Sequence, residues 1–296
     1  MSKGLTVILP AKNEIFLKKT IEETLSKSRG NVEILPVLDG YDIPDEEVVK
    51  DSRVRYIKRP FKTFDLTKRQ CINEAVEQAS YDYVMALDAH CMLGEGYDLT
   101  LLNETEENEV SILRRERLDA ENWKIYRGPD NDFLPIDYEY YMWRPLVAGI
   151  AGDSKGGLHG YRWGQRTQER LNISKDENCT FQASQWGMWK SFYKEIGLMQ
   201  VEGYTGWGCE ASEISLKALQ HGGRVVSLKN SWFAHLHKGR TYGRMYKVPL
   251  GGIHASDLYA FNDFVNKNRK IFVDLIERFY PLPGWPENWK TYLPKI

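Results

Sequence analysis

"YDYVMALDAHCML", residues 81–93, is the stretch from which the rest of this chain is best interpreted. The apolar run from Tyr83 to Leu87 predicts a buried strand that ends at Asp88 and His90. Residues two apart on a strand share a face, so both side chains can point into one crevice. A carboxylate and a neutral imidazole suit a manganese-like ion. An equally good explanation is that Asp88 caps the following turn and His90 is a surface residue.

Strand and helix patterns alternate on the N-terminal side of this stretch. The predicted elements are a strand at residues 5–9 broken by Pro10, a helix capped by Asn13 with Phe16, Leu17, Ile21 and Leu25 at helical spacing, strands at 31–40 and 53–60, and a helix at 66–80. This order is typical of a parallel sheet covered by helices, so we predict an α/β fold with a mainly parallel central sheet. Such sheets bind ligands at the carboxyl ends of their strands, where Asp39 and Asp88 lie.

The second half of the chain is less regular. Residues 120–180 are rich in Gly, Trp, Tyr and Arg with weak periodicity, which predicts a loop-dominated region. The remaining predicted elements are a strand at 111–119, a strand edge and short helix at 183–197, a helix at 210–223 ended by Gly222, a strand at 224–238 and one long amphipathic helix at 257–280.

The bulk composition excludes several classes of protein. The chain has 296 residues and a formal net charge of −1, so its overall charge predicts neither a polyanionic nor a membrane partner. Its four cysteines form no C-x-x-C pair, which favours a reducing cytoplasm over a disulfide framework. The first apolar run is too short for a signal peptide, and no later run approaches the ~20 residues of a membrane span.

Other residues could contribute to a site near Asp88 and His90. His235 follows a strand pattern and would complete a set of two histidines and one carboxylate, although His237 is a rival and a lone histidine is more often structural. Trp207 lies between two glycines and offers a flat wall of the kind that stacks on sugar rings. Glu210 could bind sugar hydroxyls or simply lie near a helix N-terminus. Asp39 could bind a uracil or ribose, or form an Asp-Gly turn.

The chain resembles a known family at these residues. The segments "TVILPAKNE", "VLDGYD" and "LDAHCML" resemble the nucleotide-binding half of GT-A glycosyltransferases of the family 2 type. The second half resembles polypeptide N-acetylgalactosaminyltransferases, which carry L-D-S-H-C-E, W-G-G-E-N-x-E-x-S and G-H-V-F-R motifs. The corresponding segments here are residues 87–91, 207–215 and 234–238. Three motifs in the right order, within residues 5–245, are more specific than any one alone.

The resemblance implies a GT-A, Rossmann-like, nucleotide-sugar-binding fold and a role for each matched residue. The implied ligands of Mn²⁺ or Mg²⁺ are Asp88, His90 and His235. The nucleotide-sugar donor, expected to be UDP-linked, would be contacted by Pro10, Asn13, Glu14, Asp39 and either Arg69 or Gln70. The donor-sugar pocket would be formed by Trp207 and Glu210, and the loop that closes over the diphosphate would contain Lys238, Arg240 and Tyr242. The implied domains are a catalytic domain at 1–256, with a nucleotide-binding half at 1–110 and a donor-sugar and acceptor half at 111–256, and a C-terminal helix and tail at 257–296.

Two departures from the family pattern affect the prediction. Relatives that act on secreted proteins carry a membrane anchor and usually a lectin domain, which this sequence does not show, so protein O-glycosylation is not a safe inference. Inverting relatives often place an Asp directly after the glutamate that corresponds to Glu210, and here that residue is Ala211. We therefore favour a retaining reaction, unless Glu210 itself is the base.

Charge patterning is the clue to the acceptor. Residues 214–256 contain no Asp or Glu but seven Lys or Arg and four of the six histidines, and residues 155–170 mix four Lys or Arg with Tyr161 and Trp163. Basic residues interleaved with aromatics suit a phosphate backbone and stacked or flipped bases. One hypothesis is therefore a transferase that glycosylates a hydroxymethylpyrimidine in viral DNA, in the cytoplasm of a bacterium or a virus-infected cell. The alternatives are a cytoplasmic transferase for a polysaccharide, glycolipid or protein, and a non-catalytic binding module with a relic site.

Overall fold

The structure is a computed structural model that describes residues 3–61, 67–143, 157–204, 208–243, 246 and 252–295, without the side chains of Arg240 and of residues 252–254. Among the residues considered above, Trp207 lies outside the described part of the chain, as does Lys155 of the basic tract at residues 155–170.

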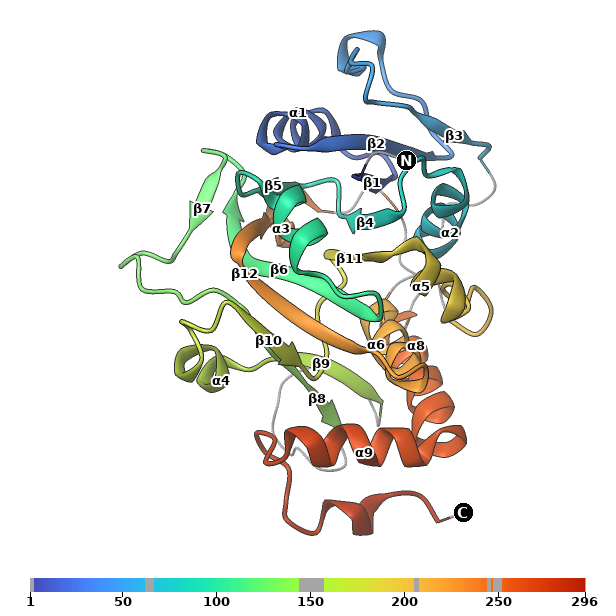
Figure 1. The fold of residues 1–296 in the computed structure, drawn as a ribbon, viewed down its shortest axis with the longest axis vertical. Coiled ribbons are helices and arrows are strands. Elements are labelled where there is room, and N and C mark those ends of the chain that lie inside the picture. The colour runs from blue at the N-terminus through green and yellow to red at the C-terminus, as the bar shows by residue number, and fades with distance from the viewer. Residues whose placement is uncertain are drawn as a thin grey trace.

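A large twisted sheet forms the centre of the molecule (Figure 1). Its strands, in spatial order, are β10 (Lys175–Asn178), β12 (Arg224–His235), β6 (Glu109–Asp119), β11 (Gln185–Trp189), β4 (Tyr83–Leu87), β1 (Gly4–Ala11), β2 (Asn31–Asp39) and β3 (Ile57–Arg59). Short β5 (Cys91–Leu93) pairs with β12, and β7 (Lys124–Tyr126) pairs with β6. In this strand order, β10 is antiparallel to its neighbour β12, and β11 is antiparallel to its neighbours β6 and β4. The other six strands run in the same direction. The predicted α/β fold with a mainly parallel central sheet is therefore confirmed.

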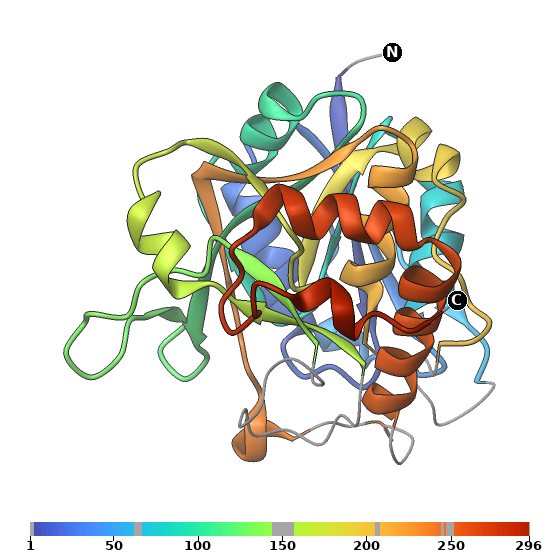
Figure 2. The ribbon, with the colours of Figure 1, turned by 90° about the horizontal axis from the view of Figure 1, so that it is seen from below.

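Helices cover both faces of this sheet. The α-helices are α1 (Leu17–Lys27), α2 (Lys68–Gln78), α3 (Tyr97–Glu104), α4 (Gly164–Glu169), α5 (Lys190–Glu195), α6 (Glu210–Gln220), α7 (Gly239–Tyr242), α8 (Gly252–Phe261) and α9 (Arg269–Phe279), with 3₁₀ turns at Asp45–Glu47 and Trp289–Tyr292. Figure 2 shows α1 and α3 on one side of the sheet and α2, α5 and α6 on the other. The strands are buried between these layers, and the apolar side chains of β1, β2 and β4 form the main core. Burial on both faces explains why β4 is apolar throughout rather than alternating.

The prediction of a loop-dominated region at residues 120–180 is wrong in part. Strands β8 (Glu139–Trp143) and β9 (Leu158–Arg162) form a separate antiparallel pair within it. All five residues of β8 are buried, and helix α9 and the C-terminal tail pack against this pair through a second apolar cluster. A strand buried on both faces has no alternation, and its partner is distant in sequence, so single-sequence periodicity does not detect the pair.

The long helix predicted for residues 257–280 is interrupted. Helix α8 passes into a π-helical segment, Asn262–Lys267, and α9 begins only after Asn268, whose backbone leaves the helical region (φ −117°, ψ 36°). The Asn268 side chain donates to the carbonyl oxygen of Asp263 at 3.0 Å. Such local side-chain bonds compete with the helical ladder, which explains the break. The domain boundary that we predicted at residue 256 falls inside α8.

Two details near the N-terminus also differ from the prediction. Strand β1 continues through Pro10 to Ala11, because its pairing with β4 ends at Ile8 and leaves an open side on which a proline is tolerated. Asn13 does not cap α1, since the helix begins at Leu17 after the flanking residue Phe16. Asn13 instead takes the left-handed conformation (φ 50°), which asparagine adopts more readily than most residues.

The structure also bears on the membrane and cysteine predictions. Among the described residues there is no helix with both the length and the apolar character needed to span a bilayer. The four cysteines are free thiols, as expected from their spacing.

Gly223 joins α6 to β12 and allows the two elements to approach closely. A Cβ at this position would lie 2.3 Å from the carbonyl oxygen of Asn108 and 2.6 Å from the ring of Phe192. We therefore expect Gly223→Ala to lower the free energy of unfolding by about 1–3 kcal/mol, the usual cost of overpacking, in urea denaturation. Gly164→Ala is the control, because its added Cβ meets nothing within 4 Å, and its effect should stay within about 0.5 kcal/mol. Equal stability of the two variants would contradict this account.

Candidate active site

A cavity of about 800 Å³ lies at the carboxyl ends of the parallel strands. Its walls come from the end of β1, the turn between β4 and β5, the ends of β6 and β12, strand β9, residues 181–184 and the start of α6. Segments from both halves of the chain therefore meet in one hollow, which is the usual position of a ligand site in an open α/β sheet.

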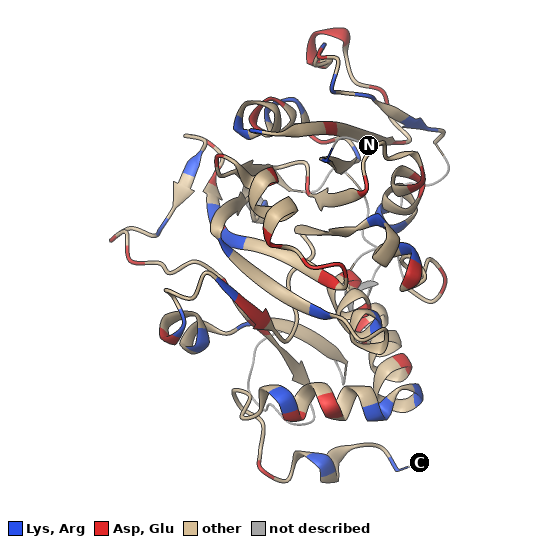
Figure 3. Ribbon diagram, in the orientation of Figure 1, with Lys and Arg blue, Asp and Glu red and all other residues tan. Residues whose placement is uncertain are grey.

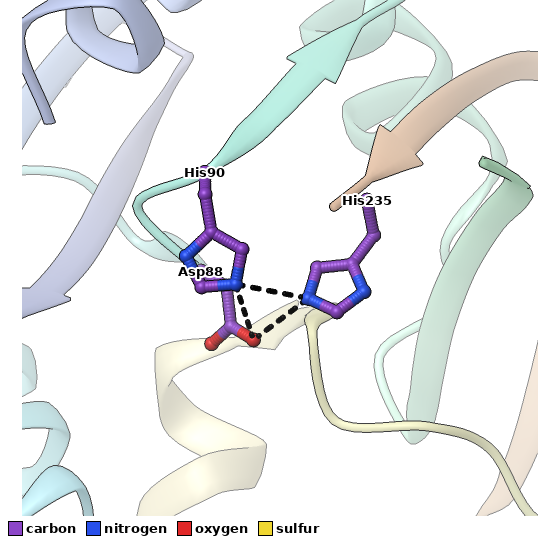
Figure 4. Close-up of side chains that lie close together, drawn as sticks. All are labelled: Asp88, His90 and His235. Carbon is purple, nitrogen blue, oxygen red and sulfur yellow. Dashed lines mark hydrogen bonds and ion pairs between the residues drawn. The ribbon is translucent and has the colours of Figure 1, made fainter. Parts of the chain in front are cut away.

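Asp88, His90 and His235 converge on this cavity (Figure 4). Asp88 follows β4, His90 precedes β5, and His235 ends β12, whose antiparallel pairing with β5 sets His235 opposite Cys91. The two Nε2 atoms are 3.1 Å apart, and Asp88 Oδ2 lies 3.3 Å from Nε2 of His235 and 4.0 Å from Nε2 of His90. One carboxylate oxygen and two imidazole nitrogens directed at one point fit a divalent ion of the manganese type. His237 contacts the His235 ring edge-on but is not part of this group.

Glu14 orients His90. Its Oε2 atom lies 3.1 Å from Nδ1 of His90 and also forms an ion pair with Lys238. Burial would raise the pKa of Glu14, but the hydrogen bond with His90 and the charge of Lys238 outweigh burial and lower this pKa. The ionised carboxylate accepts the Nδ1–H of His90 and leaves the Nε2 lone pair facing the group, an arrangement typical of metal-binding histidines.

Lys68 was not singled out from the sequence, although it lines the cavity. Its ammonium donates to Asp88 Oδ1 at 2.7 Å and to the carbonyl of Ala183 at 2.9 Å. Burial would lower the pKa of Lys68, but the charges of Asp88 and Glu210 outweigh burial and raise it. Lys68 thus binds one oxygen of Asp88 and leaves the other for the histidines. The signal available in the sequence was a lysine at the start of the helix that precedes the Asp88 motif.

The surroundings of His235, at the end of β12, favour its neutral form. Burial lowers the pKa of His235 to about 3, although the hydrogen bond to Asp88 acts in the opposite direction. Partial desolvation and then the charges of Arg115 and Arg117 also lower the pKa of His237, although this residue is exposed. Neutral imidazole is the form that binds metals, so His235 is held in the ligand-competent state.

Glu210 is the first residue of α6 and lies in the cavity wall. Its side chain is buried, and its Oε1 atom has no hydrogen-bond partner. A buried carboxylate oxygen without a partner is costly, so its position facing the cavity is consistent with a ligand that donates hydrogen bonds to it. Trp207, the other residue predicted for the donor-sugar pocket, is among those not described.

The residues predicted to contact the nucleotide fall into two groups. Pro10, Glu14 and Lys238 line the cavity, and Tyr242 packs edge-on against Phe16, with ring centroids 5.3 Å apart. Asp39 does not line it. This carboxylate is buried and bound by Lys12 at 3.3 Å, Arg59 at 2.8 Å and the Thr67 hydroxyl at 2.6 Å.

Arg69 and Gln70 are also absent from the cavity wall. The Arg69 guanidinium is fully buried, pairs with Glu213 and lies over the ring of Tyr204 at 4.0 Å. Asn13 adjoins the cavity-lining residues Lys12 and Glu14, and the side chain of Arg240 is not described.

Comparisons with known proteins agree with this arrangement. Residues 6–196 match glycosyl transferase family 2, and the chain belongs to that family. The fold is similar to that of GalNAc-T7, whose crystal structure contains UDP, GalNAc and Mn²⁺, with a TM-score of 0.67 and 16% identity over 97% of this chain and 54% of that one. The fold is therefore the GT-A fold.

Two poly-β-1,6-N-acetyl-D-glucosamine synthases of Staphylococcus epidermidis, one of them from strain RP62A, also resemble the chain. They are 28% and 27% identical to it over 111 residues, which are 36% of this chain and 26% of each relative. The chain therefore matches about a quarter of the length of these relatives.

The converging donor atoms generate a prediction about metal binding. We expect the wild-type protein to bind Mn²⁺, measured by isothermal titration calorimetry, and Asp88→Asn or His235→Ala to abolish measurable binding. Glu14→Gln should weaken binding by about 10- to 100-fold, because it removes the carboxylate that orients His90. His221→Ala is the matched control, since this exposed histidine does not line the cavity and, among the described residues, its ring bonds the carbonyl of Lys217 in the preceding helix. Binding that survives in His235→Ala would remove His235 from the ligand set.

Proposed function

We propose that this protein is a metal-dependent glycosyltransferase that moves a sugar from a nucleotide-sugar donor, expected to be a UDP-sugar, to a hydroxyl acceptor. The observation that carries the proposal is the convergence of Asp88, His90 and His235 on one cavity in a chain of glycosyl transferase family 2. These three side chains would hold Mn²⁺ or Mg²⁺. The bound ion would neutralise the donor diphosphate and stabilise it as a leaving group.

The basic side chains around the group would bind the diphosphate. Lys238 follows β12 and pairs with Glu14, so it is already held at the edge of the cavity. We propose that it turns towards a diphosphate oxygen, and that the following segment through Tyr242 closes over the donor. Closure would exclude water and so protect the activated sugar from hydrolysis. Arg240 belongs to the same proposed loop, and the residues at Pro10 and Asn13 would contact the nucleotide.

Glu210 and Trp207 would form the donor-sugar pocket. The unpartnered Oε1 atom of Glu210 in the cavity wall supports a role in accepting hydrogen bonds from sugar hydroxyls. Because Ala211 follows it where inverting relatives place an Asp, we propose a retaining reaction in which the leaving diphosphate assists the acceptor hydroxyl. The buried pairs formed by Asp39 and Arg69 support structural roles next to the nucleotide site rather than direct contact.

We propose a hydroxymethylated pyrimidine in DNA as the acceptor, with action in the cytoplasm of a bacterium or a virus-infected cell. The free thiols of the four cysteines favour a reducing compartment. The basic tract at 214–256 gives less support than its composition suggests, because its described Lys and Arg side chains lie beside carboxylates: Lys217 by Glu213, Arg224 by Glu109, Lys229 by Asp137 and Lys238 by Glu14. Figure 3 likewise shows basic and acidic residues interspersed along the ribbon. Arg117 and Arg162, which line the cavity and form no ion pair with a described carboxylate, are a better indication.

A polysaccharide acceptor is the second candidate. The specific observation in its favour is the similarity to the poly-β-1,6-N-acetyl-D-glucosamine synthases of Staphylococcus epidermidis. That similarity covers 36% of the chain, so it bears on the shared family domain more than on the acceptor.

The acceptor and the catalytic role can be tested together. The protein is incubated with Mn²⁺, a panel of sugar nucleotides and either hydroxymethylated DNA or β-1,6-linked N-acetylglucosamine oligomers. We expect nucleosides with an added sugar mass in the DNA reactions only. Asp88→Ala should reduce transfer by about 100-fold or more, because charge on the leaving group is no longer stabilised. His221→Ala should behave as wild type.

Other outcomes separate the alternatives. Extension of the oligomers without modified nucleosides would replace the DNA acceptor with a polysaccharide. Failure to consume any donor, even by hydrolysis, would favour a non-catalytic binding module. The anomeric configuration of the product, determined by NMR, tests the retaining proposal independently.

A further inference from the structure

A second hollow of about 440 Å³ adjoins the candidate active site. It shares Arg117, Ile136 and Arg162 with the wall of the larger cavity. Its remaining lining comes from residues 132–135, Gly164 and Thr167. The two hollows therefore meet along a wall that contains two arginines, and a ligand long enough to span both would pass those side chains.

The sheet sets the position of this wall relative to the proposed metal ligands. Arg117 lies on β6 directly beside His235 on β12, its register partner in a parallel pair. Arg162 ends β9, and its register partner is Glu139 on β8. The β6 and β8 regions are connected through a bridge between Arg115 and Ile136. The arginines thus extend the site from the end of β12 towards β9, on the side opposite β1 and β2.

The two arginines differ from the other cations of this region because neither guanidinium forms an ion pair with a carboxylate of the described residues. The charge of Glu116 acts on Arg117, but the ion pair of Glu116 is with Arg127. Arg117 donates to the carbonyl of Leu134 at 2.9 Å and lies over the Phe133 ring at 5.1 Å. Arg162 is exposed, and although its backbone pairs with β8, its guanidinium forms no hydrogen bond or ion pair with the described residues. Burial and the charges of Arg162 and Arg115 lower the pKa of Arg117, as expected for guanidinium groups that repel each other.

Nearby cations are paired and provide the contrast. Arg115 pairs with Glu139, Arg127 with Glu116 and Arg170 with Asp176. Asp132 is the carboxylate that lines the second hollow. A fixed positive charge at the junction of two hollows, with most of its N–H donors unused, favours an anionic ligand that accepts hydrogen bonds.

Aromatic side chains are exposed around the same arginines. Phe133, which lines the second hollow, is 41% exposed, and Tyr126, which contacts it, is 42% exposed. Tyr161, which precedes Arg162 on β9, is 38% exposed. The Tyr126 and Phe133 rings meet edge-on at 6.0 Å. Large aromatic surface is normally buried, so exposed rings next to unpaired guanidinium groups indicate a ligand that combines flat apolar groups with anions.

We propose that Arg117 and Arg162 form a phosphodiester subsite that holds a nucleic-acid strand beside the nucleotide that accepts the sugar, with Phe133 offering its ring to a base. This inference rests on the proposed function, because it assigns the acceptor side of the same cavity. A strand bound here would have one phosphate at the arginines and its neighbouring nucleoside directed into the larger cavity. A neutral polysaccharide would leave both guanidinium groups without an anionic partner, which is why the charge favours a polyanion.

The test measures binding of a fluorescein-labelled 12-nucleotide single-stranded DNA by anisotropy at several NaCl concentrations. We expect Arg117→Gln with Arg162→Gln to weaken binding by about tenfold or more and to make the log–log salt dependence shallower by about 1.4, since each phosphate contact to a single strand contributes about 0.7. The control is Arg53→Gln, an exposed arginine paired with Asp51 outside both hollows. Thermal unfolding confirms that each variant is folded.

A second pair of variants tests the aromatic contact. Phe133→Leu should weaken binding severalfold, and Phe133→Tyr should restore it, because base stacking requires an aromatic ring. Unchanged affinity and salt dependence in the double arginine variant would overturn the subsite. Displacement of the oligonucleotide by heparin at equal charge concentration, with no effect of Phe133→Leu, would overturn the nucleic-acid assignment.

The same experiments separate this inference from the proposed function. The oligonucleotide-binding assay contains neither Mn²⁺ nor a sugar nucleotide. It therefore tests the phosphodiester subsite even if the wild-type protein consumes no donor. Manganese-dependent donor hydrolysis by the wild-type protein, measured without DNA, reports on the proposed transferase activity alone.

Discussion

The antiparallel pairing of β5 with the end of β12 is the interaction on which the site depends. Strand β5 has only three residues, yet its register sets His235 opposite Cys91, next to His90. The preceding turn carries Asp88, and the carbonyl of Ser184 accepts the Asp88 backbone N–H at 2.8 Å. Two hydrogen-bonded strand ends therefore bring the three side chains together, although His90 and His235 lie 145 residues apart along the chain. A shift of one residue in this register would turn His235 to the other face of the sheet.

Electrostatic pairing then divides the cavity into two regions. On the side of β1 and α2, Lys68, Lys238 and Glu14 surround the proposed ligands and are paired with one another or with Asp88. On the side of β6 and β9, Arg117 and Arg162 keep their charge without carboxylate partners in the described structure. Such an asymmetry suits a reaction with two substrates, because each region presents a different set of groups to a ligand. The GT-A fold alone does not specify this difference, since fold does not fix the acceptor.

Several local predictions were correct because the signal was local. The run that ends at Asp88 is buried as β4, and Gly222 follows α6 in the left-handed conformation (φ 73°). Other predictions failed where tertiary contacts overrode the local pattern. Pro10 lies inside β1 because one side of that strand has lost its partner, and Asn268 breaks a helix that periodicity alone continued. The basic composition of residues 214–256 also overstated the free positive charge of this segment. Lys217 pairs with Glu213, which directly precedes the segment, and Arg224 pairs with Glu109, which is distant in sequence.

The sequence by itself determined the family, the α/β class and two of the residues proposed to hold a metal, Asp88 and His90, because these follow from short motifs and from the order of strands and helices. The tertiary structure decided between His235 and His237 by bringing His235 to the other two. Only the tertiary structure decided which charged side chains face the cavity. Lys68 lines it whereas its neighbour Arg69 is buried against Glu213, and Asp39 is bound by Lys12 and Arg59. The physical reason is that the partner of a charge is chosen by distance in space, and the residues that neutralise these groups lie up to 144 positions away along the chain.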